Sequence, residues 1–573
     1  MYKAKQDFFV FYNLCHCMNR SLSLEKLKTE NFDVCIIGGG ASGVGCALDA
    51  ALRGLKVAII DKEDFASHTS SKSTKLIHGG VRYLEQAFKN FDFAQLNQVR
   101  HGLEERHTVI KNAPYLAHPL ALLTPCFNWF EAVYYTIGLT MYDWFAGDDP
   151  LPKSRWLSKK KALQQISGLD PRKLHSAVLY YDGQLDDARY CLMIAKTAAE
   201  TGASVANYVR VNGFSKNGKK RLTVAHVTDE RTGETFDIKS KLFINCAGPM
   251  ADTVRLMANP NLTPRIKRSK GVHAMLPLSI FKNENDTSAA GAIKTAMLIP
   301  KTTDGRVIFA IPWEGELLLG TTDTPYESEV EEPVLEEDEI SFLLENLNNY
   351  VTANVTRDQV KAGFGGLRPL LMSDNTKKST KQLLRDHEVE HDYESGLISL
   401  MGGKWTTYRV MAKDTIDDAC KFLDVDERCT TDEKKLVGAD GYRFRNWERL
   451  QLDFGLETDI CQHLMKKYGA RAERVALLTA ENKMLSERIS PAYPFIKAEV
   501  VYSVRAEMAQ TIRDVMARRT RLELIDWHAA DAAIETVAAL MATELAWTDA
   551  QTNEQVQTYR AELKGFIKKA SMQ

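Results

Sequence analysis

Residues 32–61, FDVCIIGGGASGVGCALDAALRGLKVAIID, join a strand, a glycine turn, a helix and a second strand. Phe32 to Ile37 is a mostly apolar run of strand length, and a second such run, Lys56 to Ile60, follows the helix. Where the helix should begin, glycines stand at G-x-G-x-x-G spacing, namely Gly38, Gly40 and Gly43. This order predicts a βαβ unit that binds a dinucleotide.

Each position of the glycine turn has a chemical purpose. Gly38 permits the tight turn, Gly40 lets the backbone approach a pyrophosphate, and Gly43 allows close packing of the helix on the strand. The helix N-terminus offers free N–H groups to the anion. Asp61 ends the second strand, at the distance where a carboxylate accepts hydrogen bonds from an adenosine ribose. These residues predict a dinucleotide site, but they suit NAD as well as FAD.

Length and composition are those of an ordinary protein of several domains. At 573 residues the chain is too long for one core, and about three domains are expected. Lys plus Arg (74) balance Asp plus Glu (75), so the chain has no overall positive charge that would attract nucleic acid. The ten cysteines form no C-x-x-C pair, and the thirteen histidines form no metal-spaced cluster. We therefore expect buried thiols, no structural metal and no nucleic-acid partner.

An aromatic segment, FNWFEAVYYTIGLTMYDWF at 127–145, is interrupted by charge only at Glu131 and Asp143. It is amphipathic and too polar to span a bilayer, so it suits a membrane interface; a core helix or a dimer helix is the alternative. The side chains expected to meet lipid are Trp129, Phe130, Tyr134, Ile137, Leu139, Met141, Tyr142, Trp144 and Phe145. Whether residues 1–30 are a targeting segment is left open, because they lack the Arg-rich, Ser-rich composition of a transit peptide.

Three later stretches belong beside the first glycine turn. Residues 67–85, SHTSSKSTKLIHGGVRYLE, directly follow the second strand, so their hydroxyl groups are placed to reach a cofactor. Leu242 to Pro249, LFINCAGP, is a buried strand that leads into a small-residue turn. Leu397 to Arg409, LISLMGGKWTTYR, repeats the order of strand, glycine and helix. Between them, Tyr181 to Arg189 has the composition of a polar turn before a helix.

The rest of the chain predicts a β-rich domain that covers the substrate and a helical C-terminal domain. Beyond Val425 the clearest helices are Phe495 to Leu524 and Asp531 to Leu545. The expected division is an N-terminal extension (1–30), a discontinuous cofactor domain (31–110, 181–260 and 386–425), a substrate domain (111–180 and 261–385) and a helical C-terminal domain (426–573).

Taken together, these stretches resemble the FAD-dependent glycerol-3-phosphate dehydrogenases, a membrane-associated and quinone-reducing family. The matches, in family order over residues 32–425, are IIGGGASGVGCALDAALRG, TSSKSTKLIHGGVRYLE, YYDGQLDDAR, INCAGP, GTTDTP, GLRPL, LLRDH and GGKWTTYR. Residues 504–522, VRAEMAQTIRDVMARRTRL, resemble the family's helical cap. Two features depart from the pattern: residues 1–30 match nothing in it, and the D-x-[DN]-x-[DN]-G calcium loop of animal members is absent, so calcium control is not expected.

The resemblance implies an α/β plus α fold class: an FAD-binding Rossmann-like domain of the glycine-oxidase-like flavoprotein type, a β-sheet substrate domain and a helical C-terminal domain. It implies oxidation of sn-glycerol 3-phosphate to dihydroxyacetone phosphate by hydride transfer to FAD, with a ubiquinone-type quinone as electron acceptor. The alternatives are an oxygen-reducing glycerol-3-phosphate oxidase, another FAD-dependent 2-hydroxy-acid or amino-acid oxidase, a nicotinamide dehydrogenase, and a non-enzymatic protein that holds FAD structurally.

The resemblance also implies a location and an assembly. We expect a homodimer that lies on one leaflet of the mitochondrial inner membrane without crossing it. The alternative location is the inner face of a bacterial-type cytoplasmic membrane.

The resemblance further implies which residues form the site. Arg368, Arg385 and Lys404 lie on stretches that match substrate-binding motifs, and two guanidinium forks with a point charge can hold a phosphate dianion. We favour His273 as the base, because an imidazole titrates near neutral pH. The catalytic candidates are His273, Arg82, Tyr83 and Lys404. The substrate-binding candidates are Arg368, Arg385, Lys404 and Arg82. The FAD-binding candidates are Gly38, Gly40, Ser42, Gly43, Asp61, Lys62, Ser70, Ser71, Ser73, Thr74, His78, Gly79, Ala247, Gly248, Gly402, Gly403, Lys404 and Thr406.

Overall fold

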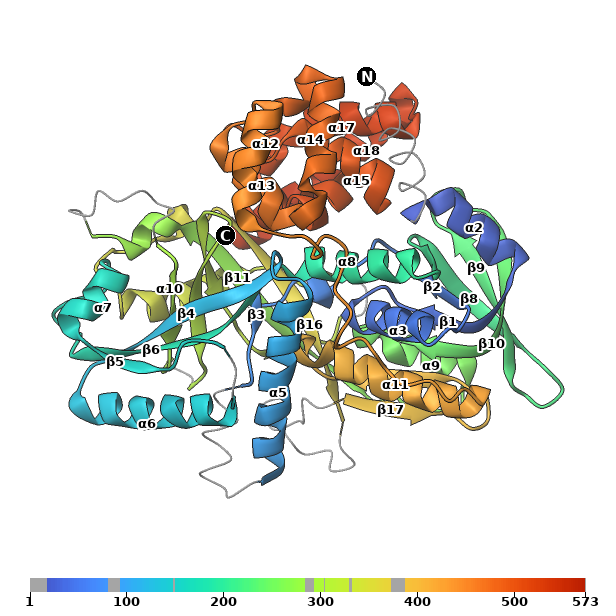
Figure 1. Cartoon of the computed structure of the whole chain (residues 1–573), viewed down its shortest axis with the longest axis horizontal. Coiled ribbons are helices and arrows are strands. Elements are labelled where there is room, and N and C mark those ends of the chain that lie inside the picture. Colours follow the sequence, from blue (N-terminus) through green and yellow to red (C-terminus); the bar gives the residue numbers. More distant parts are fainter. Residues whose placement is uncertain are drawn as a thin grey trace.

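The computed structural model describes residues 18–80, 93–147, 150–283, 293–302, 305–328, 332–372 and 387–571. The described strands form two sheets, and the C-terminal helices lie over the junction between them (Figure 1). Three predicted site residues, Arg82, Tyr83 and Arg385, fall outside the described ranges.

The first sheet is built on the predicted βαβ unit. β1 (Asn31–Ile37), α3 (Ala41–Leu52) and β2 (Val57–Ile60) follow one another, and β1 runs parallel to β2 on one side and to β10 on the other. A strand in that central position is buried on both faces, which explains its nearly continuous apolar sequence. The other strands are β7 (Ser204–Ala206), β8 (Val209–Lys216), β9 (Leu222–Asp229), β10 (Thr235–Asn245), β17 (His387–His391) and β18 (Ile398–Gly402), in the order β17-β18-β10-β1-β2-β7, with the β8–β9 hairpin attached to β10.

The second sheet has ten strands in the described ranges, ordered β15-β11-β14-β13-β12-β4-β6-β3, with β16 paired to β11 and β5 paired to β6. Its strands are β3 (Leu76–Ile77), β4 (Ala117–Cys126), β5 (Arg155–Ser158), β6 (Ser176–Leu185), β11 (Ile266–Pro277), β12 (Thr295–Ile299), β13 (Ile308–Trp313), β14 (Glu316–Gly320), β15 (Thr324–Pro325) and β16 (Ala362–Leu371). The strands of the first sheet fall in the expected cofactor domain, and those of the second sheet fall in the expected substrate domain. The exceptions are β3 and residues 181–185 of β6, which lie in the second sheet although their residues were expected in the cofactor domain.

Helices cover both sheets. α3 packs beside α8 and α11 on the first sheet, and α6 packs against β4, β5 and β6 of the second (Figure 1). The helices before the C-terminal region are α2 (Arg20–Thr29), α5 (Phe93–Asn112), α6 (Trp129–Phe145), α7 (Lys159–Gln165), α8 (Asp187–Glu200), α9 (Ala251–Ala258), α10 (Glu337–Asn348) and α11 (Tyr408–Leu423). All cysteines in the described ranges are free thiols, and all but Cys429 are buried, as expected.

The expected polar turn at Tyr181 to Arg189 is wrong. Residues 181–185 continue β6 and pair with β4, and α8 begins at Asp187. The polar side chains misled the prediction because they are buried with partners: Asp182 binds Arg106, and Gln184 contacts His118 at 3.1 Å. A polar strand of this kind depends on long-range partners that local sequence does not reveal.

The single helix expected over Phe495 to Leu524 is also wrong. α15 (Lys497–Glu507) ends where Met508 adopts a left-handed φ of 54°, and a π-helical turn (Asp514–Arg519) and α16 (Leu522–Ile525) follow. Buried ion pairs made by this segment override its helical periodicity, as described below. The other C-terminal helices are α12 (Trp447–Phe454), α13 (Thr458–Tyr468), α14 (Ala472–Glu481), α17 (Trp527–Leu545) and α18 (Asp549–Ser571).

Candidate active site

A cavity opens at the carboxyl ends of β1, β10 and β18, where an open α/β sheet binds its ligands. Ten of the predicted FAD-binding residues line it: Gly38, Gly40, Ser42, Asp61, Ser70, Ala247, Gly248, Gly402, Gly403 and Lys404. The remaining eight are not among its lining residues: Gly43, Lys62, Ser71, Ser73, Thr74, His78, Gly79 and Thr406. The three glycine turns predicted from separate stretches therefore meet at one cavity.

The glycine turn has no room for side chains. Gly38 adopts a φ of +115°, and a Cβ there would lie 2.5 Å from the carbonyl oxygen of Cys246. A Cβ on Gly43 would lie only 1.8 Å from the carbonyl oxygen of Gly38, so α3 packs directly on the turn. Gly40 faces the cavity, and its Cβ would lie 3.0 Å from the Ser70 hydroxyl. The backbone is thus exposed at the helix N-terminus, which fits the pyrophosphate of a dinucleotide.

Asp61 closes the turn from the side of β2. Its carboxylate accepts hydrogen bonds from the backbone N–H of Gly39 at 2.5 Å and of Glu63 at 2.9 Å. Burial raises the pKa of Asp61 to about 6, against these two N–H groups, which favour the charged form. The carboxylate lines the cavity, and its predicted contact with a ribose stays a prediction.

The hydroxyl-rich loop 67–75 forms another wall. The Ser70 hydroxyl accepts the N–H of Ala41 at 2.9 Å, which ties the loop to the first residue of α3. The Trp405 indole donates to the Ser70 carbonyl oxygen at 2.9 Å, and the Thr69 hydroxyl donates to the carbonyl oxygen of Leu367 at 2.7 Å. This loop therefore joins α3, β16 and the segment after β18 around one cavity.

Two predicted hydroxyl groups point to protein partners instead. The Ser73 hydroxyl donates to the Asp187 carboxylate at 2.7 Å, and the Ser71 hydroxyl donates to the carbonyl oxygen of His68 at 3.2 Å. Sequence reasoning did not single out His68, although it lines the cavity. Its position in the loop was visible, but an alternation of inward and outward side chains cannot be read from a run of polar residues.

A second, smaller cavity extends from the first toward the substrate sheet. The two share His68, Thr69, Ala247 and Pro249, and the smaller one reaches Gly365, Gly366 and Leu367 on β16. A dinucleotide in the first cavity thus has a path to the sheet that carries the predicted substrate residues.

His273 lies on β11, opposite Gly320 of β14 and Phe364 of β16. Its Nε2 contacts the Thr74 hydroxyl at 3.0 Å, and its ring stacks on Phe364 with centroids 4.9 Å apart. Nδ1 is buried, with no hydrogen-bond partner among the described residues. Burial, and then the charges of Lys75 and Arg368, lower the pKa of His273 well below its usual range. The imidazole is therefore neutral at physiological pH.

The predicted phosphate ligands approach this region from two directions. Arg368, on β16, donates to the Thr322 carbonyl oxygen at 3.1 Å and the Lys270 carbonyl oxygen at 3.3 Å, so its guanidinium is held in one orientation. Lys404 follows β18 and lines the first cavity. The charge of Arg368 contributes to lowering the pKa of His273. Arg385, Arg82 and Tyr83 lie outside the described residues.

Sequence reasoning missed Lys75, which is fully buried. Its ammonium donates to the Asp187 carboxylate and to the Ser71 carbonyl oxygen, each at 2.7 Å, and lies 4.7 Å from the ring centre of Phe364. Burial lowers the pKa of Lys75 to about 7, with a further contribution from Arg521 and against the attraction of Asp187. No local pattern distinguishes a buried lysine from an exposed one in such a loop.

Comparison with known proteins agrees with this geometry. The family model described as FAD dependent oxidoreductase matches residues 33–409, which is the class that the fold and the cavity define. A second model, the C-terminal domain of alpha-glycerophosphate oxidase, matches residues 429–552. The chain belongs to the glycerol-3-phosphate dehydrogenase family of FAD-dependent oxidoreductases. The predicted family, fold class and flavin cofactor are therefore confirmed.

Relatives match over nearly the whole chain. The mitochondrial glycerol-3-phosphate dehydrogenase of Mus musculus is 41% identical over 94% of this chain and 74% of its own length. The mitochondrial glycerol-3-phosphate dehydrogenase SDP6 of Arabidopsis thaliana is 39% identical over 94% of this chain and 87% of its own. The solved structure of glycerol-3-phosphate dehydrogenase from Bacillus halodurans, complexed with FAD, is similar with a TM-score of 0.78 and 29% identity, covering 98% of this chain and 99% of that chain.

Proposed function

We propose that the chain oxidises sn-glycerol 3-phosphate to dihydroxyacetone phosphate and passes the electrons to a ubiquinone-type quinone. The observation that carries this proposal is the pairing of β11 with β16, which places His273 and Arg368 on adjacent strands of the substrate sheet. The turns at Gly38, Ala247 and Gly402 would hold FAD in the first cavity. FAD, when bound, accepts the hydride from C2 of the substrate.

The phosphate group of the substrate is bound by cations. Arg368 offers a guanidinium charge whose orientation is fixed by its bonds to the Lys270 and Thr322 carbonyl oxygens, and Lys404 offers a point charge at the cofactor cavity. Arg385 is proposed as a third cation from its place in the LLRDH stretch. Since the net charge of the chain is −1, an anionic substrate depends on such local cations.

His273 takes the hydroxyl proton as the hydride leaves. The tautomer that donates Nε2–H to the Thr74 hydroxyl leaves Nδ1 as the acceptor, and Nδ1 is the buried atom without a described partner. Proton transfer to a positioned base contributes roughly 10²- to 10⁴-fold to a rate. His273 is the proposed catalytic base on these grounds.

The pH profile tests the role of His273. We expect kcat/KM to stay level through about pH 6.5, the ordinary histidine value, and to fall only at lower pH, because the folded pKa is depressed. Unfolded chains bind the proton first, so the free energy of unfolding should also fall as the pH drops below about 6.5. His273→Asn should lower kcat by roughly 100-fold or more and remove this acid limb. An acid limb centred above pH 6.5 in the wild type would contradict the assignment.

The electron acceptor is tested by parallel assays of oxygen uptake and quinone reduction during turnover of glycerol 3-phosphate. We expect quinone reduction with little oxygen uptake, as proposed for a membrane-associated dehydrogenase. Stoichiometric peroxide without quinone reduction would favour the oxygen-reducing oxidase instead.

The location that we propose is the surface of the mitochondrial inner membrane, since the glycerol-3-phosphate dehydrogenases of Mus musculus and Arabidopsis thaliana that this chain resembles are named as mitochondrial. Among the described residues, no helix is long and apolar enough to cross a bilayer. α6 offers a surface instead: Trp144, Phe130 and Trp129 are 76%, 67% and 57% exposed. Tyr134 and Ile137 share this exposure, whereas Leu139 and Tyr142 are buried, so the expectation that those two side chains meet lipid is wrong.

The acidic residues of α6 do not oppose membrane contact. Glu131 binds Lys301 at 2.9 Å and accepts the N–H of Phe127, and Asp143 accepts the N–H of Ser154. Both carboxylates are thereby hydrogen-bonded within the protein, and the large exposed side chains of α6 are aromatic and aliphatic. A dimer helix remains the alternative, while a core helix is inconsistent with this exposure.

Replacing Trp129, Phe130 and Trp144 by serine should release the protein from liposomes. Each buried CH₂ contributes about 0.8 kcal/mol, so losing three rings removes several kcal/mol of attachment. Turnover with a soluble dye acceptor should be unchanged, and the matched control is serine at Trp156, a 51% exposed tryptophan on β5. Unchanged co-sedimentation with liposomes, together with a shift from dimer to monomer, would make α6 a subunit contact.

A further inference from the structure

Three buried arginines of the C-terminal domain donate hydrogen bonds to the loops that line the cofactor cavity. Arg518 and Arg519 end the π-helical turn, and Arg521 follows with a φ of 73°. All three residues are at most 7% exposed, although arginine normally lies at the surface. None of the three lines either cavity, so the mechanism above does not use them.

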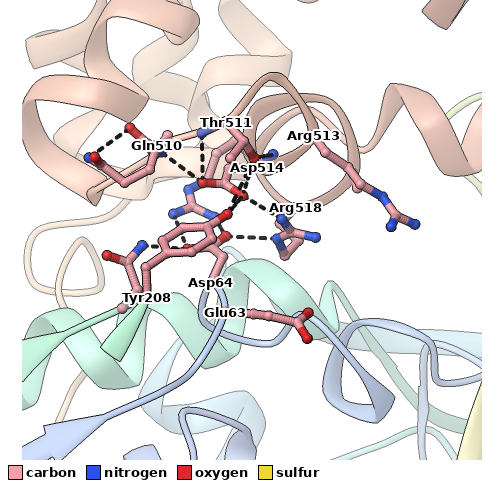
Figure 2. Close-up of polar contacts among 12 residues, drawn as sticks. Glu63, Asp64, Tyr208, Gln510, Thr511, Arg513, Asp514 and Arg518 are labelled. Carbon is pink, nitrogen blue, oxygen red and sulfur yellow. Dashed lines mark hydrogen bonds and ion pairs between the residues drawn. The ribbon is translucent and has the colours of Figure 1, made fainter. Parts of the chain in front are cut away.

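Two of these arginines hold the loop after β2. Arg518 binds the Asp64 carboxylate at 2.7 Å, and Arg519 binds it through two nitrogens at 2.5 and 3.1 Å. Figure 2 shows Arg518 between Asp64 and Asp514, whose carboxylate also accepts the Tyr208 hydroxyl at 2.6 Å. Asp64 is fully buried and stands three residues after Asp61, which lines the cavity.

The third arginine holds the hydroxyl-rich loop from behind. Arg521 donates to the Ser71 carbonyl oxygen at 2.8 Å and to the Asp187 carboxylate at 2.7 Å. Asp187 in turn accepts the backbone N–H of Ser73 at 3.0 Å and the Lys75 ammonium at 2.7 Å. Ser70, next to Ser71, is the residue that this loop presents to α3 and to the cavity.

The arrangement makes the shape of the cavity depend on the C-terminal domain. Asp64 and Asp187 are wholly buried, and each is paired with two cations, Arg518 and Arg519 for Asp64 and Arg521 and Lys75 for Asp187. Removing one partner of a buried ion pair is unfavourable, so each loop is held less firmly if its arginine is lost. The loops carry cavity residues on one face and these anchors on the other.

We propose that Arg518, Arg519 and Arg521 are positioning residues for FAD, through which the C-terminal domain fixes the two loops that line the cofactor cavity. This inference rests on the assignment of FAD to that cavity. The arginines act through Asp64 and Ser71 rather than by touching the cofactor. FAD affinity is therefore set partly by a domain that makes no contact with FAD.

Arg521→Lys is the main test, because it keeps a positive charge near Asp187 but removes the guanidinium, whose Nη2 donates to both Asp187 and Ser71 while Nη1 donates to the Ala517 carbonyl oxygen. Titration of the apoprotein with FAD should give a dissociation constant raised by about tenfold, as expected for loss of a charge-assisted hydrogen bond. The matched control, Arg505→Lys, alters an arginine of α15 that pairs with Glu544 within the same domain, and should leave the constant unchanged. Arg519→Lys serves if Arg521→Lys does not fold.

A purely structural role predicts a different result. In that case Arg521→Lys lowers the thermal midpoints of the apoprotein and of the FAD-loaded protein equally while the FAD dissociation constant stays at the wild-type value, which overturns the proposal. A double-mutant cycle with Ser70→Ala gives a second criterion: effects on FAD affinity should be non-additive if Arg521 acts through the loop, and additive effects overturn it.

The variant Gly40→Val distinguishes failure of the positioning role from failure of the assignment of FAD to this cavity. Valine would fill the cavity against Ser70, at a position whose φ of −77° tolerates a side chain. If this variant loses FAD while Arg521→Lys binds it normally, only the positioning role fails. If Gly40→Val binds FAD as tightly as wild type, FAD does not occupy this cavity.

Discussion

Gly43→Ala is expected to give a colourless protein that retains no FAD. The added Cβ would lie 1.8 Å from the carbonyl oxygen of Gly38, an approach that no nonbonded carbon and oxygen atoms tolerate, so α3 or the turn must move. The N–H groups at the start of α3 would then no longer point toward the pyrophosphate. The absorption spectrum of the purified variant measures the loss, and far-ultraviolet circular dichroism shows that the fold persists.

Gly213→Ala is the matched control for this prediction. Gly213 lies in β8 of the same sheet, and no described atom comes within 4 Å of the position of its added Cβ. This variant should carry the full amount of flavin. Retention of stoichiometric FAD by Gly43→Ala would show that the predicted turn is not where the pyrophosphate binds.

Arg368→Ala is expected to raise KM for glycerol 3-phosphate by roughly 10- to 100-fold, since charge-assisted hydrogen bonds contribute about 1.5 to 3 kcal/mol each. FAD should stay bound, because Arg368 does not line the cofactor cavity. Steady-state kinetics with a soluble acceptor measure the effect, and Arg368→Lys should be intermediate because it keeps the charge without the fork.

The control for Arg368 is Arg210→Ala, an exposed arginine that pairs with Glu230 on the first sheet. Its KM should equal that of the wild type. If Arg368→Ala turns over glycerol 3-phosphate with an unchanged KM, the phosphate is bound elsewhere and the proposed cation set is wrong.

The parts of the fold that could be predicted are those with local geometric causes. The turn at Gly38 needs a positive φ, and α3 needs a residue without a side chain at Gly43, so the glycine spacing alone locates the βαβ unit. The later turns at Ala247 and Gly402 follow buried strands in the same way, and all three meet at the cavity. His273 and Arg368 came from the family resemblance, and the sheet places them on the adjacent strands β11 and β16.

The parts that could not be predicted depend on partners far away in the chain. Asp182 reads as a turn residue until Arg106 lies against it, and the segment around Arg518 reads as a regular helix until Asp64, 454 residues away, pairs with it. The burial of Lys75 depends on Asp187 and Phe364, which are far away in the sequence and contact its ammonium. Each case is a buried polar group whose burial is compensated only in the folded chain.

The central claim is that the chain oxidises glycerol 3-phosphate with its own flavin, and anaerobic titration of the FAD-loaded protein with glycerol 3-phosphate tests it most directly. The oxidised flavin absorbance should bleach within one turnover, with about one dihydroxyacetone phosphate formed per FAD, and Arg368→Ala should need a much higher concentration to reach the same bleaching. If the flavin stays oxidised at saturating glycerol 3-phosphate while chemical reductant bleaches it, the chain is not a glycerol-3-phosphate dehydrogenase in activity.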